Sequence, residues 1–511
     1  MKILKYNNMN KKLLIGLFLL VGLFSSCKKW LDLQPESDIA APELFSTENG
    51  FMDAINGVYT KAAIADLYGK ELTFGTTEAL AQNYSVREDG EDYRQTTLFN
   101  YKQGKFIERK DKIWAGLYSA IANCNLILLN VDEKKNVFSA ANYELVKGEA
   151  LALRAYFHFD LLRLFAPSYL SNPSAQAIPF VTKYSKDPTP MSNVSEVIEL
   201  IRKDLEESKA LLMKDPVRSP GYKIGYPTVR DTTFNTEESS PFLFLQNRRH
   251  RMNYFAVCGA LARVYLYKND KANALINARL VIDEKRADGK PKFPWTLSTD
   301  FGAFDEEKKD RILYQELVFG WYIPDMAQNI KDYWFRSGTN GLYLIGDAGD
   351  FIYEKQTAGA LDSRFKYYLT KSSTQGNGDH YEIVKYLRNT KSELPNANLH
   401  YLMAPAIRLS EMYYIAAEAI FPTNPAKAYE YLNAVRSARD IGDKLPVSTQ
   451  EDFLRELAKE VRKETLAEGQ LFYFYKRLNR GIVGPTGAVI PPTNNIFVLP
   501  LPNDELVYGG R

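Results

Sequence analysis

Apolar residues recur at helical spacing along most of the chain. In one early segment, Phe51, Ile55 and Val58 fall on one face of a helix, and Ser46 stands where a helix cap is expected. A longer segment, residues 142–165, repeats the pattern and stops before Pro167. The spacing predicts a mostly α-helical protein, with helices within about residues 46–66, 111–166, 192–213, 252–283 and 405–439.

Two of these ranges have the pattern of helix pairs. Residues 252–267 and 271–282 are joined by a short turn, and so are residues 408–420 and 425–439. Both pairs carry Ala where two helices would approach closely, which is typical of a tetratricopeptide-like hairpin. The repeat is not regular along the chain, so we expect helix pairs rather than a simple solenoid.

Three long stretches lack the helical pattern. They are residues 67–110, 215–250 and 287–400, and the last is rich in Gly, Pro, Asp and Asn and contains one predicted strand, residues 316–323. Long loops in a compact protein are usually functional or act as linkers. We therefore expect a loop-rich insert with short strands beside the helix pairs.

The N-terminus has the pattern of a targeting segment. Lys11 and Lys12 precede an apolar run, residues 13–24, which is too short to cross a bilayer. The run leads into Ser-Ser-Cys27, which resembles the lipobox of bacterial lipoproteins, where the Cys carries the acyl chains. The alternative is a plain secretory signal with an incidental Cys. We expect a lipoprotein signal peptide over residues 1–26, a lipidated tether over 27–45 and one globular domain over 46–511.

Composition narrows the class of protein further. The chain has 511 residues, 45% of them hydrophobic, so it can bury a large core without disulfides or metals. Four lysines of the targeting segment account for the net charge of +3, and the remaining chain carries −1. This balance gives no electrostatic case for nucleic-acid binding. Cys124 and Cys258 lie in apolar helical patterns, which favours buried thiols over a disulfide between them.

Sequence motifs for catalysis are missing. The chain contains no His-Glu-x-x-His, Cys-x-x-Cys, Gly-x-Ser-x-Gly or phosphate-binding loop, so we predict no enzyme activity, cofactor or metal site. Because any two of the 62 acidic residues could form a catalytic pair, spacing alone leaves a glycosidase open. Five acids fall at helical spacing and are expected on solvated faces or beside Arg: Glu411, Glu418, Glu460, Glu464 and Glu468.

Four segments, in order along the chain, resemble the SusD/RagB family of surface lipoproteins from Bacteroidetes. They are Cys-Lys-Lys-Trp-Leu-Asp from Cys27, Leu-Arg-Ala-Tyr-Phe-His-Phe from Leu153, the Arg-Leu-x-Glu helix that follows Pro405, and Glu468-Gly469 followed by Leu-Pro-Leu-Pro from Leu499. Many members carry Arg two residues after the Gly, where this chain has Leu471. That departure affects an ion pair of the family rather than the fold.

The resemblance implies a SusD-like fold and a binding protein that is not an enzyme. Such a protein would be lipid-anchored in the outer membrane, facing outward, as a lid over a TonB-dependent transporter of the SusC type. It would capture an oligomeric nutrient, usually a glycan and in some branches a peptide. The residues decide neither the ligand class nor whether the insert holds a Ca²⁺ site.

Aromatic residues outside the helices are the candidate ligand contacts, because flat rings suit the apolar faces of sugars. The insert supplies Trp295, Trp321 and Trp334, and the earlier loop supplies Tyr84 and Tyr93. Hydrogen bonds could come from the polar residues beside them, Asn83 and Arg87. Each ring could instead fill the core, as we expect for helical Trp114. A polysaccharide hydrolase and a helical scaffold for envelope proteins remain alternative functions.

Overall fold

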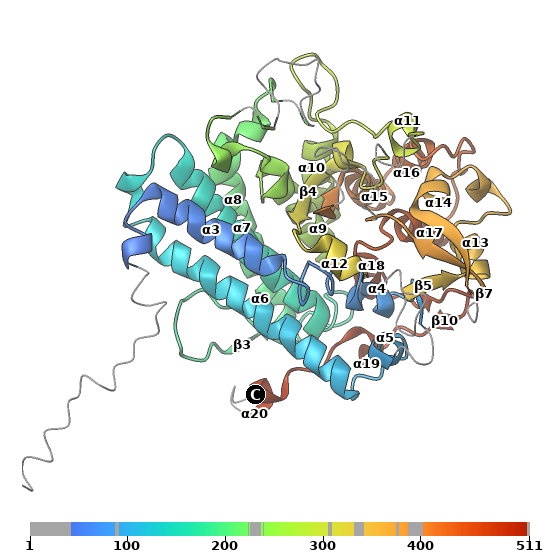
Figure 1. Ribbon diagram of the computed structural model, residues 1–511, viewed down its shortest axis with the longest axis horizontal. Coiled ribbons are helices and arrows are strands. Elements are labelled where there is room, and N and C mark those ends of the chain that lie inside the picture. Colours follow the sequence, from blue (N-terminus) through green and yellow to red (C-terminus); the bar gives the residue numbers. More distant parts are fainter. Residues whose placement is uncertain are drawn as a thin grey trace, which may run out of the picture.

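Long helices fill one side of the molecule, and short helices and strands fill much of the other (Figure 1). The computed structural model describes residues 42–86, 91–222, 224, 237–238, 240–304, 309–331, 342–374, 378–386 and 402–507. The long helices are α3 (Glu48–Ala62), α6 (Gly104–Val131), α7 (Asn142–Phe165) and α8 (Val194–Leu211). They lie side by side, and α7 packs against both α6 and α8. The prediction of a mostly α-helical protein is confirmed.

Polar residues at the helix starts explain where these helices begin. The Thr47 hydroxyl accepts a hydrogen bond from the Gly50 N–H at 3.1 Å, and Asn193 forms a capping box with Glu196. Such caps contribute about 1 kcal/mol each. By length and hydropathy α6 would pass for a membrane span, but it packs against α3 and α7 within the helical layer.

Both predicted helix pairs form. The first is α9 (Tyr254–Tyr267) with α10 (Lys271–Ile282), and the second is α15 (Leu409–Ile420) with α16 (Pro425–Ser437). Helix α10 packs on α15, so the pairs stack on each other. Two further helices follow, α17 (Gln450–Glu464) and α18 (Leu471–Arg477), which were not among the predicted pairs.

The strands are short and antiparallel. They are β1 (Ser85–Val86), β2 (Gln176–Pro179), β3 (Met191–Asn193), β4 (Leu317–Tyr322), β5 (Leu342–Ile345), β6 (Leu369–Thr374), β7 (Gly378–Ile383), β8 (Met403–Arg408), β9 (Ile482–Val483) and β10 (Val489–Ile490). One sheet has the order β1-β5-β7-β6, and the others are the pairs β2–β3, β4–β8 and β9–β10. The strand predicted at residues 316–323 is β4, whereas residues 405–408, predicted as helix, belong to strand β8.

Short helices occupy much of the predicted loop stretches. They are α4 (Thr76–Leu80), α5 (Glu91–Thr97), α11 (Ser298–Phe301), α12 (Met326–Lys331), α13 (Gly346–Ile352) and α14 (Ser363–Tyr368). Two more, α19 (Asn494–Phe497) and α20 (Asn503–Val507), lie near the C-terminus. The stretch 67–110 is therefore less irregular than predicted, since it also holds the first turns of α6.

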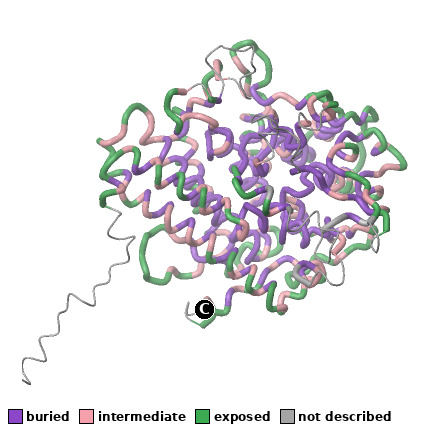
Figure 2. Tube along the Cα trace, viewed as in Figure 1, coloured by how far each residue is buried: buried purple, intermediate pink, exposed green. Residues whose placement is uncertain are grey.

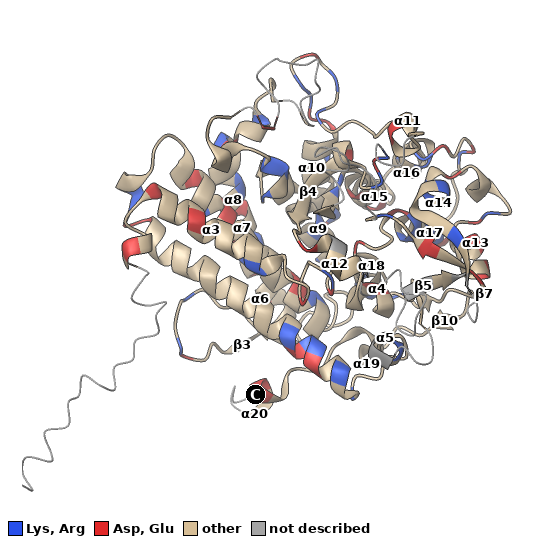
Figure 3. Ribbon diagram, in the orientation of Figure 1, with Lys and Arg blue, Asp and Glu red and all other residues tan. Residues whose placement is uncertain are grey.

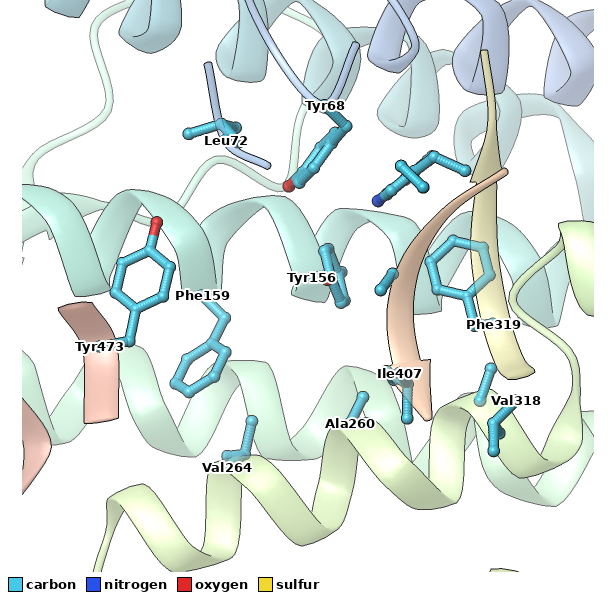
Figure 4. Packing of buried hydrophobic residues seen from close by; sticks show 14 of the residues in the cluster. Tyr68, Leu72, Tyr156, Phe159, Ala260, Val264, Val318, Phe319, Ile407 and Tyr473 are labelled. Carbon is cyan, nitrogen blue, oxygen red and sulfur yellow. The ribbon is translucent and has the colours of Figure 1, made fainter. Parts of the chain in front are cut away.

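Aromatic side chains fill the core around α7. Figure 2 shows the buried chain concentrated inside the molecule, and Figure 4 shows Tyr156 and Phe159 of α7 facing rings from other elements. Among those partners are Tyr68, Phe319 of β4 and Tyr473 of α18. Trp114 is buried, as predicted, and Cys124 and Cys258 are buried free thiols.

A network of buried ion pairs joins the C-terminal helices to the insert. Glu464 of α17 accepts hydrogen bonds from Arg408, Arg439 and Arg364, and Glu468 accepts from Arg408 at 2.9 Å. Removing one partner of such a pair leaves a buried charge uncompensated and costs about 3–5 kcal/mol. The acids at helical spacing are thus partners for Arg, as one alternative held, and Glu460, Glu464 and Glu468 do not face solvent.

Candidate ligand-binding site

The structure places Trp321 in the core. Its ring is 1% exposed and stacks on Tyr68 with the centroids 4.3 Å apart. Strand β4 is buried over five of its six residues, because β8 pairs with it and α9 packs on it. A ring in this position offers no face to a ligand, so the prediction that Trp321 binds a sugar is wrong in this structure. Only Tyr322, at the end of the strand, is exposed.

The earlier loop is also turned inward. Tyr84 is buried and donates a hydrogen bond to the Phe74 carbonyl at 2.7 Å. Tyr93 is buried and donates to Glu71 at 2.8 Å, with the Arg109 guanidinium 4.3 Å from its ring centroid. Tyr84 therefore ties one part of the loop to another, and Tyr93 does the same while its ring packs against Arg109 of α6, contrary to the prediction that they contact a ligand.

Asn83 has a structural role instead of the predicted ligand contact. Its side chain is buried, donates to Glu78 at 2.7 Å and accepts from Arg462 Nε at 2.9 Å. Glu78 also accepts from the backbone N–H groups of Ala467 and Gly469. Although these donors favour the carboxylate, burial raises the pKa of Glu78 to about 7. Asn83 thus clamps the N-terminal loop to the end of α17.

The other predicted site residues divide into two groups. Trp295 is half-buried, with its ring centroid 4.9 Å from that of Tyr413 and the Arg439 guanidinium 5.4 Å from it. Part of the Trp295 side chain remains exposed to solvent, so its contact with a ligand stays a prediction. Arg87, Trp334 and the lipidation residue Cys27 lie outside the described residues.

The two stretches predicted to share a ligand face do meet. Strand β1 pairs with β5 in the register Val86↔Leu342, and the Asn329 side chain donates to the Gly69 carbonyl at 3.0 Å. Trp321 and Tyr68 form a third contact between them. Residues far apart in the sequence are therefore joined where the insert meets the earlier loop.

A cavity of about 710 Å³ opens beside this junction, between α13, α17 and the β9–β10 hairpin. We call it the α13–α17 cavity; its walls come from residues 350–352 and 354–357 of the insert, Arg455, Ala458, Lys459 and Arg462 of α17, and Tyr475, Arg480, Gly481, Val483 and Val489. The volume is in the range of small-molecule sites, which are mostly apolar with a few placed polar groups.

Phe351 supplies a flat, accessible ring at this cavity. The side chain is 47% exposed, and a Cβ added at Gly487 in the hairpin would lie 3.3 Å from it. Gly487 has φ +87°, a conformation that favours glycine, so the turn leaves room for the ring. Sequence reasoning missed Phe351 because it considered Trp and Tyr alone, although the residue lies inside the predicted insert.

Charged residues surround the apolar wall, and Figure 3 shows both basic and acidic residues around α13 and α17. Lys459 lies 2.9 Å from Glu354 and Lys463 lies 2.7 Å from it, while Lys355 lies 3.2 Å from Asp350. Burial opposes ionisation of Glu354, but Lys463 and Lys459 outweigh it and hold the pKa of that carboxyl below its usual range. A carboxylate held ionised is a poor general acid, since a glycosidase needs one carboxyl with a raised pKa. The arrangement suits binding.

The described part of the chain shows no cluster of side chains suited to binding a metal ion. No group of three or more His, Cys, Asp or Glu side chains is arranged there to hold an ion. The cavity walls therefore offer a ring, apolar side chains and paired charges as their means of recognition.

Comparison with known proteins agrees with the fold. A family model described as "Starch-binding associating with outer membrane" matches residues 29–224, and the SusD family model matches residues 290–484. SusD-like protein P38 of Formosa agariphila is 22% identical, over 97% of this chain and 96% of that protein.

Solved structures with the same fold come from Bacteroides. A SusD superfamily protein of Bacteroides thetaiotaomicron has a TM-score of 0.70 at 21% identity, covering 91% of this chain and 98% of that one. A SusD-like carbohydrate binding protein of Bacteroides vulgatus has a TM-score of 0.66 at 19% identity, covering 91% and 97%. The two family models together span well over half of the sequence, and the fold agrees along its length: the chain belongs to the SusD/RagB family.

Proposed function

We propose that the protein captures an oligomeric nutrient, a glycan in preference to a peptide, and binds it without cleaving it. The observation that carries the proposal is the α13–α17 cavity, with the half-exposed ring of Phe351 beside paired charges. Sugar rings present apolar C–H faces and polar hydroxyls, which match such a wall. The description of the first family model as starch-binding supports a glycan over a peptide.

The proposed location is the outer membrane, facing outward, with acyl chains on Cys27. The short apolar run before Cys27 and the family description support this location. Several acyl chains would hold the protein stably at a membrane surface, which one chain alone does not. From there the protein would deliver its ligand to a partner TonB-dependent transporter of the SusC type.

Titration calorimetry with a panel of oligosaccharides and peptides tests the proposal. The chain from residue 28, without the lipidated Cys27, is used, with Phe351→Ala as the cavity variant. Loss of the ring should weaken binding of the best saccharide about tenfold, or about 1.4 kcal/mol. Phe242→Ala is the matched control, because Phe242 is 67% exposed but does not line the cavity. Trp295→Ala tests the ring that the sequence singled out, and weaker binding with unchanged stability would add it to the site.

Three results would contradict the proposed function. If only peptides bind, the ligand is a peptide and not a glycan. If neither saccharides nor peptides bind, the result favours a helical scaffold for envelope proteins. Turnover of any saccharide, lost when one carboxylate is mutated, would make the protein a hydrolase.

A further inference from the structure

More basic than acidic side chains line the α13–α17 cavity, because several acids that pair with the basic residues do not line it. The cavity wall includes five cations, Lys355, Arg455, Lys459, Arg462 and Arg480, but only two acids, Asp350 and Glu354. In the part of the chain that the structure describes, the other acids that form ion pairs with these cations are Glu451, Asp452 and Glu456, and none of them lines the cavity. The region is thus close to neutral as a whole, yet its cavity-facing surface is positive.

Arg462 adds a buried charge that no acid neutralises directly. Its side chain is 4% exposed, and its donors go to neutral acceptors: Asn83 Oδ1, the Gln82 carbonyl and the Val483 carbonyl, each at 2.9 Å. Within the described part of the chain no carboxylate lies within 4.0 Å of it, and Glu78 reaches it only through Asn83. A buried guanidinium in this situation favours an anion in the adjoining cavity, because low polarity strengthens the attraction.

Two of the cations are partly exposed and are held by ion pairs near the surface. The side chains of Arg455 and Lys459 are 55% and 40% exposed, and surface ion pairs of this kind contribute about 0–1 kcal/mol, so exchanging a protein carboxylate for a ligand anion costs little. Arg also binds planar oxyanions through two parallel hydrogen bonds.

We infer that the α13–α17 cavity is selective for acidic saccharides, whose carboxylate or sulfate groups would lie against Arg455 and Lys459 while a sugar ring packs on Phe351. This inference rests on the proposed function and narrows its substrate class. The Phe351 ring and the apolar wall favour a saccharide over an acidic peptide, because the apolar face of a sugar ring can pack flat on Phe351 while its anionic group lies beside it.

Matched pairs of ligands test the inference, each pair differing only in charge. Suitable pairs are galacturonate oligomers and their methyl esters, alginate oligomers and their carboxyl-reduced forms, and sulfated galactan oligomers and their desulfated forms. At 50 mM NaCl the acidic member of at least one pair should bind at least tenfold more tightly than its neutral partner. The advantage should shrink at 300 mM NaCl, because salt screens charges near the surface.

The double variant Arg455→Gln/Lys459→Gln locates the selectivity. It should weaken binding of the acidic oligomer about tenfold, and more strongly than it weakens binding of the neutral oligomer. Lys112→Gln is the control, since Lys112 is an exposed, ion-paired lysine on α6 away from the cavity.

Four results would overturn the inference. They are equal affinity within every pair, tighter binding of the neutral members, a preference that the double variant leaves intact, and binding of acidic peptides alone. If neutral and acidic oligomers bind equally, the inference fails while the proposed function stands. If no saccharide binds at all, both fail.

Discussion

Replacing Asn83 by Ala should destabilise the protein without acting on the ligand. The side chain makes two buried hydrogen bonds to charged groups, to Glu78 at 2.7 Å and from Arg462 at 2.9 Å. Hydrogen bonds to charged groups contribute about 1.5–3 kcal/mol each. Glu78 keeps two backbone donors and Arg462 keeps its carbonyl acceptors, so the low end applies, and we expect a loss of about 3 kcal/mol.

Urea denaturation followed by tryptophan fluorescence measures this loss. A lower midpoint with an unchanged slope reports a true change in stability. Asn100→Ala is the matched control, because the Asn100 amide donates to Gln95 at the surface, and it should change stability by less than about 0.5 kcal/mol. If Asn83→Ala kept full stability and lost ligand affinity, Asn83 would belong to a binding site and the clamp would be refuted.

Three further predictions concern a buried acid, a backbone position and the anchor. Burial, together with the like charges of Glu316 and Asp300, raises the pKa of Asp310 to about 7, so its folded form binds a proton that the unfolded chain releases near pH 4. The free energy of unfolding should therefore fall as pH rises from about 4 to 7. Asp310→Asn should raise it by about 2–4 kcal/mol at pH 8 but by little at pH 4. Equal increases at both pH values in urea melts would contradict the predicted pH dependence. Gly469→Ala should lower stability by at least about 2 kcal/mol, because Gly469 has φ +71° and a Cβ there would lie 2.4 Å from the Leu72 carbonyl oxygen. The control Gly442→Ala, with open space around the residue, should lower stability by less than about 1 kcal/mol. Similar melting temperatures for the two variants would argue against a constrained backbone at Gly469. Cys27→Ser should release the protein from the membrane fraction of its host, and continued membrane association would count against lipid anchoring.

The helices could be predicted from the sequence because apolar spacing and caps are local signals. The pair α9–α10 forms at the predicted residues, and α16 starts at Pro425, a residue suited to the first turn of a helix. The predicted helical range begins at residue 405, but residues 405–408 pair with β4 and form a strand. Such a pairing partner, more than eighty residues away, leaves no trace in local spacing.

The candidate site could be predicted only in part. The insert forms one wall of the α13–α17 cavity, and its contact with residues 67–86 follows the expected grouping of the two stretches. That a ligand binds there stays a prediction. The prediction for Trp321 failed because the sequence indicates the strand at residues 316–323 but not that β8 pairs with it and α9 packs on it, which buries the ring. Asn83 looked like a free polar residue because its partner Arg462 lies 379 positions away.

The cavity itself was beyond sequence reasoning. The cavity forms where α13, α17 and a two-residue strand of the hairpin meet, and the sequence of each element alone does not indicate a cavity. The cation excess also appears only when side-chain directions are known, since the acids and bases of α17 are nearly balanced along the sequence.

A crystal structure of the mature chain with its tightest-binding oligosaccharide tests the central claim most directly. The account predicts density for an intact saccharide inside the α13–α17 cavity, with a sugar ring against Phe351. An empty cavity with the saccharide bound elsewhere, or density for a cleaved product, would contradict it.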